Sequence, residues 1–131
     1  MSNDVTVTYR DFGGCTIVTV PGDVDQGSAD EIKASAAADD VRHVVLDLGN
    51  ASAVHPAAAD VLAALHRRTQ ERGGGVCFVT REDGVRSQVS AAAAGSPISP
   101  SFYDEIGDAL EASMAARQAA RRDCDTVNAA G

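Results

Sequence analysis

Hydrophobic and polar residues alternate near the start of the chain, and this pattern predicts a β-hairpin. Residues 5–9, VTVTY, alternate with a period of two, which is typical of a half-buried strand near a sheet edge. Residues 11–14 have the composition of a turn, and residues 15–20, CTIVTV, form a second apolar run. We therefore expect the chain to begin with two antiparallel strands joined by a tight turn.

Two later stretches are apolar almost without interruption. Residues 43–48 and 76–79 are rich in Val, Leu and Phe, which is typical of strands buried on both faces. Between them lies a helical pattern that starts at Pro56 and ends at the three glycines 73–75. Its expected core-facing residues are Ala58, Val61, Leu62 and Leu65. A strand, a helix and a strand in this order predict a parallel pair joined by a crossover helix.

Two shorter stretches predict further helices. Ser28 and Glu31 have the spacing of a capping box, which predicts a helix that starts at Ser28 and ends near Ala38. Residues 85–95 have the pattern of a short helix that Gly95 closes. Each segment carries small apolar residues along one side, so we expect both helices to bury that side.

The last part of the chain predicts one more strand and a long helix. Residues 98–102 suit a short edge strand, because the prolines around them exclude a central one. Asp104 is expected to cap a helix that ends near Arg122. The expected buried stripe of this helix is Ile106, Ala109, Leu110 and Met114. Residues 1–122 then form a single domain, and residues 123–131 form a flexible tail.

The order of these elements predicts an α/β fold. We expect a four- to five-stranded mixed sheet that starts with a β-hairpin, with about four helices packed mainly on one face. The 131 residues suffice for one hydrophobic core. Aromatic residues make up only 4% and there is no Trp, so the core must consist of Val, Ile, Leu and Ala.

Charge and targeting signals narrow the class of protein. The formal net charge of -8 repels phosphate backbones and anionic lipid headgroups, so we expect neither a nucleic acid nor a membrane as partner. The N-terminal residues show no signal peptide, and no stretch approaches the roughly 20 apolar residues of a membrane span. We therefore expect a cytoplasmic protein.

The three cysteines do not suggest a disulfide framework or a metal site. Their number is odd, and no CxxC motif or Cys/His cluster has metal-ligand spacing. Cys77 lies in an apolar run and is most simply a core residue. Cys15 opens another such run, and Cys124 lies in the polar tail. A redox pair among Cys15, Cys77 and Cys124 stays open as a regulatory device.

No constellation of residues predicts an enzyme. His43 opens a central strand and is expected to be structural, whereas His66 is expected to be solvated on the exposed side of its helix. His55 alone lies on a candidate functional surface, and no nucleophile is expected beside it. The triple glycine precedes a strand rather than a helix, so it does not form a phosphate-binding loop. We expect no catalytic residue, no metal and no cofactor.

The start of the central helix is unusual because it carries no reactive side chain. It has the sequence His55-Pro56-Ala57-Ala58, without a hydroxyl, a thiol or a carboxylate. Proline at the first helical position is favourable, since its missing N–H would be unpaired there anyway. The stretch is thus either simply a good helix start or a contact surface.

Three stretches of the sequence resemble motifs of the STAS domain family, and within it of the small bacterial anti-sigma factor antagonists. They are GDVD at residues 22–25, VVLDLGNASAVHPAAADVL at residues 44–62 and FYDEIGDAL at residues 102–110. The resemblance covers roughly residues 5–114. It implies a non-enzymatic binding module that docks on an anti-sigma factor, often a serine kinase. The displaced sigma factor is then free for transcription, commonly in a stress response.

The sequence departs from the family at the motif D-S-S-G, in which the kinase phosphorylates a serine. The Asp aligns with His55, the two hydroxyl positions align with Pro56 and Ala57, and the Gly aligns with Ala58. Neither Pro56 nor Ala57 can accept phosphate, so we expect docking without this switch. Ser52 is the nearest hydroxyl and is expected to make a local turn hydrogen bond.

The resemblance, together with the helix pattern, defines an expected docking surface. Its expected residues are Ser52, His55, Pro56, Ala57, Ala58, Asp60, Ala63 and Arg67. The expected partner is an anti-sigma factor, and the protein itself is expected to be a monomer or a weak homodimer. An alternative is a scaffolding STAS protein that assembles with other STAS domains and binds no anti-sigma factor.

Overall fold

Five strands form one mixed sheet in the computed structural model, which describes residues 7–12, 15–35, 42–95 and 99–130. Their order in the sheet equals their order in the chain. The strands are β1 (Thr8–Phe12), β2 (Cys15–Thr19), β3 (His43–Asp47), β4 (Gly75–Val79) and β5 (Ser101–Tyr103). Each strand therefore pairs only with its neighbours in sequence.

The pairing confirms the predicted mixed sheet. β1 and β2 are antiparallel, with Thr8 opposite Thr19, as expected for the hairpin. The bounds of the first strand were wrong, because it spans Thr8–Phe12 rather than residues 5–9, and Asp11 and Phe12 pair with β2 instead of forming the turn. β2, β3, β4 and β5 are parallel to one another. The predicted short edge strand exists but covers only Ser101–Tyr103, and Ile98 lies outside the described residues. β5 is parallel to β4 and pairs with it from Cys77 onward.

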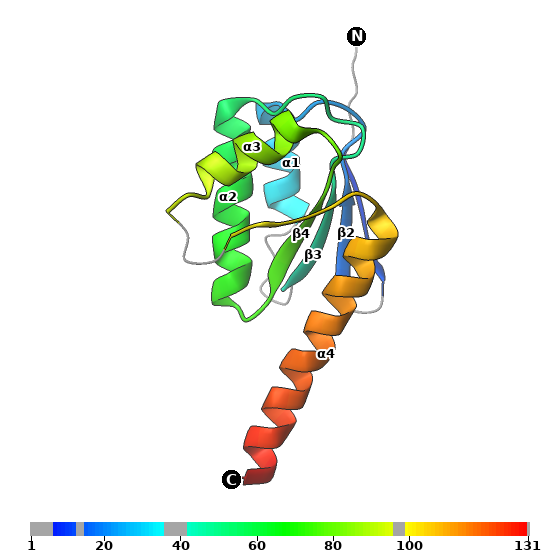
Figure 1. Cartoon of the computed structure of the whole chain (residues 1–131), viewed down its shortest axis with the longest axis vertical. Coiled ribbons are helices and arrows are strands. Elements are labelled where there is room, and N and C mark those ends of the chain that lie inside the picture. The colour runs from blue at the N-terminus through cyan, green and yellow to red at the C-terminus, as the bar shows by residue number, and fades with distance from the viewer. Residues whose placement is uncertain (1–6, 13–14, 36–41, 96–98, 131) are drawn as a thin grey trace.

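In the described part of the chain, four helices cover the sheet, three on one face and one on the other (Figure 1). They are α1 (Gln26–Ser35), α2 (Pro56–Glu71), α3 (Asp83–Ala92) and α4 (Ile106–Ala130). α2 lies between α1 and α3 and contacts both. α4 packs against the opposite face of β3 and β4. The prediction that helices pack mainly on one face is confirmed.

The central strands of the sheet, β2, β3 and β4, are largely buried on both sides, which explains their continuous apolar character. The larger core lies under α1, α2 and α3 and includes the fully buried Leu46, Leu62 and Phe78. A smaller cluster under α4 consists of Ile17, Val45, Val79 and Ala109. Successive residues of β3 therefore point into different cores, because side chains alternate between the two faces of a strand.

The predicted capping box at Ser28 is wrong. α1 begins at Gln26, and the carboxylate of Asp25 accepts a hydrogen bond from the Ser28 backbone N–H at 2.8 Å. This bond holds the pKa of Asp25 below its usual range. Oε2 of Glu31 accepts a hydrogen bond from the Val7 N–H at 3.2 Å. An Asp three residues upstream has displaced Ser28 from the cap, and Ser28 lies buried inside the helix.

The ends of α3 and α4 also differ from expectation. α3 ends at Ala92 with Ala93 as its cap, rather than at Gly95. Glu105 rather than Asp104 takes the cap position of α4, because the Glu105 carbonyl accepts from the Ala109 N–H at 3.3 Å. Oδ1 of Asp104 instead accepts a hydrogen bond from Arg86 Nη2 at 2.6 Å. Ile106 is 36% exposed rather than buried.

α4 is longer than predicted and buries a different residue. It runs to Ala130 rather than ending near Arg122, and its last part projects away from the sheet (Figure 1). Ser113 is buried beside Ala109, while Leu110 and Met114 are only partly buried. The single domain of residues 1–122 and the flexible tail of residues 123–131 stay predictions.

Candidate functional site

The connection between β3 and α2 forms a fixed loop at the carboxyl end of the parallel strands. Val24 and Val54 form an isolated parallel bridge, so this loop lies beside the segment that follows β2. The Val24 N–H donates to the Ala53 carbonyl at 3.1 Å, and the His55 N–H donates to the Val24 carbonyl at 2.8 Å. These bonds connect two loops that are far apart in sequence and fix the approach to α2.

Two polar side chains from different elements hold the same loop. Oδ1 of Asp23 accepts from the backbone N–H groups of Ser52 at 2.7 Å and Ala53 at 3.3 Å. Oε1 of Gln88, on α3, accepts from the Val54 N–H at 3.1 Å. Three consecutive amides are thus satisfied by side chains rather than by water. Neither role was predicted from the sequence, although Asp23 lies inside the GDVD stretch; no local signal marks Gln88.

The start of α2 is capped by a histidine. His55 has extended backbone angles, φ -61° and ψ 139°, and its Nδ1 accepts from the Ala57 N–H at 3.2 Å. This bond requires Nδ1 to be unprotonated, which places any ring hydrogen on Nε2. Pro56 occupies the first helical position, as predicted. The imidazole therefore performs the capping task that Ser, Thr, Asp or Asn usually performs.

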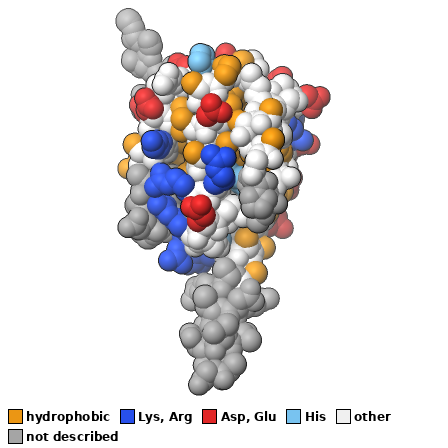
Figure 2. All heavy atoms as spheres, turned by 90° about the vertical axis from the view of Figure 1, so that its left-hand side faces the viewer, with side chains coloured by type: hydrophobic (Ala, Val, Ile, Leu, Met, Phe, Trp, Pro, Cys, Tyr) orange, Lys and Arg blue, Asp and Glu red, His pale blue; other side chains and the backbone are white. Residues whose placement is uncertain are grey.

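The structure places most of the expected docking residues at the surface. Ser52, His55, Pro56, Asp60 and Arg67 are exposed, and Ala57 is partly exposed. On the α2 side of the molecule, hydrophobic side chains gather over the upper part and Lys and Arg side chains over the lower part (Figure 2). The loop and the exposed side of α2 thus form one continuous face.

Two of the expected docking residues are wrong. Ala58 and Ala63 have no exposed surface, because both belong to the buried side of α2 together with Leu62. Their side chains therefore cannot contact a partner. The buried side of α2 is wider than the predicted stripe, since it also contains Ala59, His66 and Thr69. The exposed side of α2 that a partner could contact is therefore narrower than predicted.

The histidines differ in their burial from the prediction. His66 is 1% exposed rather than solvated, because it lies one residue after Leu65 on the buried side of α2. His43 is also buried, as expected of a structural residue. Burial lowers the pKa of His43, and the guanidinium groups of Arg117 and Arg42 lower it further. His43 is therefore held in its neutral form.

The structure does not join the two cysteines that it describes in full. Cys15 and Cys77 are both free thiols. Cys15 is buried and accepts a hydrogen bond from Ser113 Oγ at 3.3 Å. Burial raises the pKa of Cys77 to about 11, so this thiol is protonated and poorly nucleophilic at neutral pH. The Cys124 side chain lies outside the described part of the chain, so a redox role for it stays a prediction.

Neither a metal site nor a membrane span is found where the structure is described. Within residues 7–12, 15–35, 42–95 and 99–130, no group of three or more His, Cys, Asp or Glu side chains could hold a metal ion. Over the same residues, no helix combines the length and the apolar character that crossing a bilayer requires.

Comparisons with known proteins agree with the fold. Residues 6–109 match the model of the STAS domain family. An anti-sigma factor antagonist from Mycobacterium paratuberculosis is 23% identical, with a TM-score of 0.66 over 82% of this chain and 92% of that chain. The anti-sigma factor antagonist SpoIIAA, in its unphosphorylated form, is 11% identical, with a TM-score of 0.62 over 81% of this chain and 96% of that chain. No curated protein matches the sequence significantly.

Proposed function

Because the chain belongs to the STAS domain family, we propose that it is a non-enzymatic regulatory module that docks on an anti-sigma factor and so frees a sigma factor for transcription. The observation that supports this function most is the exposed, fixed start of α2. His55 and Pro56 lie at the surface, while Asp23 and Gln88 hold the backbone just before them. A loop that is already ordered loses little conformational entropy on binding.

The docking face lacks the covalent switch that the family motif implies. Pro56 and Ala57 occupy the two hydroxyl positions, and neither can be phosphorylated. Ser52 is exposed, but the Asp23 carboxylate lies 2.7 Å from its backbone nitrogen. A phosphate on Ser52 would place a second negative group beside this carboxylate. The proposed module therefore acts without serine phosphorylation at the start of α2.

The proposed setting is the bacterial cytoplasm, with the protein as a monomer or a weak homodimer. The net charge of -8 disfavours nucleic acid and anionic membranes as partners. The exposed docking residues retained for the anti-sigma factor are Ser52, His55, Pro56, Ala57, Asp60 and Arg67. No cofactor is required for such binding.

The direct test measures complexes with the anti-sigma factors encoded in the source genome. Purified protein and each candidate are mixed and sized by light scattering, and affinities are measured by calorimetry. Ala57→Arg adds a long cationic side chain to the docking face and is expected to weaken binding at least about tenfold. Thr8→Arg makes a similar change on exposed edge strand β1 and is expected to leave binding unchanged.

The outcome also separates the proposal from a scaffolding role. Tyr9 on edge strand β1 is 63% exposed, which is a specific feature that favours assembly with other STAS domains. Self-association without any complex would support the scaffold and overturn the proposed function. Incubation with ATP and a candidate kinase tests the missing switch, and phosphate within residues 50–58 would contradict it.

A further inference from the structure

The docking loop, residues 48–55 between β3 and α2, ends in a residue that rarely caps a helix. The usual caps Ser, Thr, Asp and Asn do not change their charge between about pH 5 and 8, whereas histidine ordinarily does. His55 is exposed, and its Nδ1 accepts from the Ala57 N–H at 3.2 Å. The cap of α2 is therefore a group that can take up a proton under mildly acidic conditions.

The first turn of α2 depends on this ring for one of its few free backbone donors. The first four N–H groups of a helix have no acceptor within the helix. Among them, His55 donates to the Val24 carbonyl at 2.8 Å, and Pro56 has no N–H. Ala57 and Ala58 remain, and the His55 ring serves Ala57. The ring thus satisfies one of the two donors that need an outside acceptor.

Proton uptake by the ring and the cap bond exclude each other. The neutral ring accepts through the lone pair on Nδ1, and a proton on Nδ1 occupies that lone pair. Both ring nitrogens are then donors, and Nδ1–H would face the Ala57 N–H. A positive ring would also lie at the positive end of the helix dipole. Both effects drive a protonated His55 ring away from the start of α2.

Carboxylates lie on the segments around His55. Asp23 and Asp25 belong to the segment after β2, and Asp60 lies on α2, whereas α3 reaches the loop with the neutral Gln88. The Ser28 N–H holds the pKa of the Asp25 carboxyl below its usual range, so Asp25 is ionised. Carboxylates attract an imidazolium rather than repel it, so these groups permit proton uptake at His55.

We propose that His55 is a proton-operated switch of the docking face, in which protonation releases the cap of α2 and weakens docking. The effect on docking rests on the proposed function, whereas the release of the cap does not. The bonds from the Val24 carbonyl and the Asp23 carboxylate to the loop do not involve the ring, so the change is confined to the first turn of α2. A proton switch needs no hydroxyl, and Pro56 and Ala57 supply none.

The first experiment uses the free protein. The exchange rate of the Ala57 amide is measured by NMR at pH 7.5 and pH 5.5 and is divided by the rate of an unstructured chain at the same pH. Protection of this amide is expected to fall at least about threefold at pH 5.5, following the titration of the His55 ring. His55→Asn keeps a neutral acceptor at the cap and is expected to give equal protection at both pH values.

The second experiment measures docking on an anti-sigma factor that binds at pH 7.5. The affinity of the wild type is expected to fall at least about threefold between pH 7.5 and pH 5.5, and that of His55→Asn to fall less. Both proteins meet the same partner, so titration of the partner affects them equally. His43→Gln removes a histidine at the other end of the sheet and is expected to keep the wild-type response.

The two experiments separate this switch from the proposed function. If no anti-sigma factor binds at either pH, the proposed function fails, and Ala57 exchange still tests the switch. If a partner binds but Ala57 protection is equal at both pH values, the switch is overturned while the proposed function stands. The switch is also overturned if wild type and His55→Asn lose protection or affinity to the same extent.

Discussion

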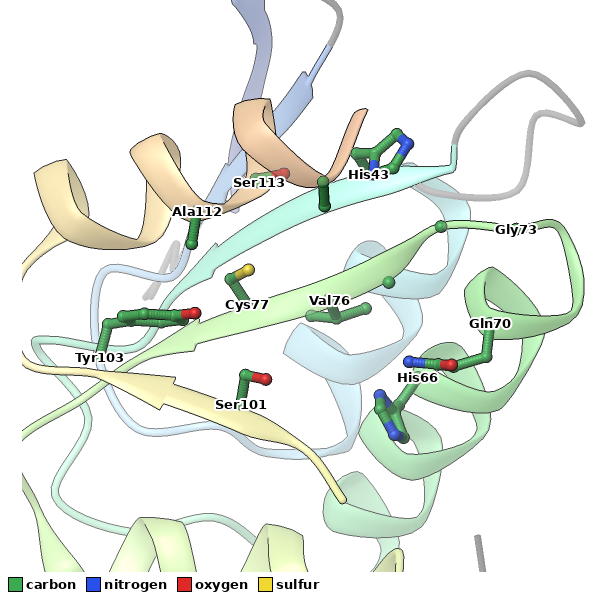
Figure 3. A pocket seen from close by; sticks show the side chains of 13 residues that line it. His43, His66, Gln70, Gly73, Val76, Cys77, Ser101, Tyr103, Ala112 and Ser113 are labelled. Carbon is green, nitrogen blue, oxygen red and sulfur yellow. The ribbon is translucent and has the colours of Figure 1, made fainter. Parts of the chain in front are cut away.

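The two ends of the parallel strands use backbone and side chains in opposite ways. At the carboxyl ends, Asp23 and Gln88 tie up the loop amides, and the surface shows a proline and small apolar groups. At the amino ends, residues 73–75 form a glycine rim beside a pocket that polar side chains such as His43 and Tyr103 line (Figure 3). The first end depends on side-chain acceptors, whereas the second depends on the absence of side chains, so mutations should affect the two ends differently.

The largest expected effect concerns the glycine rim. Gly74→Ala would place a Cβ 1.8 Å from the Arg42 carbonyl oxygen, and backbone must move to relieve the clash. We expect the free energy of unfolding to fall by about 3 kcal/mol, measured by urea denaturation. Gly107→Ala, on α4, meets no atom within 4 Å and is the control, with stability unchanged or slightly raised. A loss below about 0.5 kcal/mol in Gly74→Ala would contradict the close approach.

The next effect concerns the side chain that holds the docking loop. Asp23→Ala removes the acceptor for the Ser52 and Ala53 amides and is expected to cost about 1–2 kcal/mol of unfolding free energy. Hydrogen exchange at these two amides should accelerate more than exchange in β3. Asp23→Asn keeps an acceptor oxygen and is expected to restore much of the protection. Equal exchange in all three proteins would show that Asp23 does not hold the loop.

A smaller effect is expected at the cap of α2. His55→Ala removes the acceptor for the Ala57 N–H and should lower the free energy of unfolding by about 1 kcal/mol. His55→Ser supplies a hydroxyl acceptor at the same position and is expected to retain wild-type stability. Thermal and urea denaturation of the three proteins check this. If the Ala and Ser variants are equally stable, the imidazole does not act as a cap.

The smallest effect is a pH dependence at the pocket end. The pKa of His43 is lowered in the folded protein, so the unfolded chain binds a proton more readily than the folded one. Stability from this group is fully present above the usual pKa of 6.5 and declines as the pH falls below it. The difference in unfolding free energy between wild type and His43→Gln, followed from pH 7.5 to 5.5, isolates this contribution. A difference that stays constant with pH would refute the coupling.

The order of strands and helices could be predicted because their patterns have distinct periods. The unbroken apolar runs of β3 and β4 correspond to strands that are buried on both faces. The alternation at residues 5–9 predicted that a strand exists here but not its bounds, because β1 begins at Thr8 and residues 8–11 are all exposed. The position of Pro56 at the start of α2 also followed from the sequence, because proline has few alternatives inside a helical segment.

The sequence could not decide which of two competing residues caps α1, nor which side chains of α2 face the core. Asp25 and Ser28 are both good caps, and only the geometry before α1 decided in favour of Asp25. Ala63 and His66 were placed on the exposed side of α2, but neighbours on both sides, α1 and α3, bury a wider sector of this helix. The bond from Gln88 to the docking loop spans 34 residues, which no local pattern reveals.

The sequential order of the five strands has a consequence for how the protein forms. Each new strand adds to the edge that the preceding strand has just left open, so no strand must be inserted between two others. The hairpin of β1 and β2 can form first, and each later strand can add as it emerges from the ribosome. The strand order is therefore compatible with a sheet that grows strand by strand during synthesis from the N-terminus.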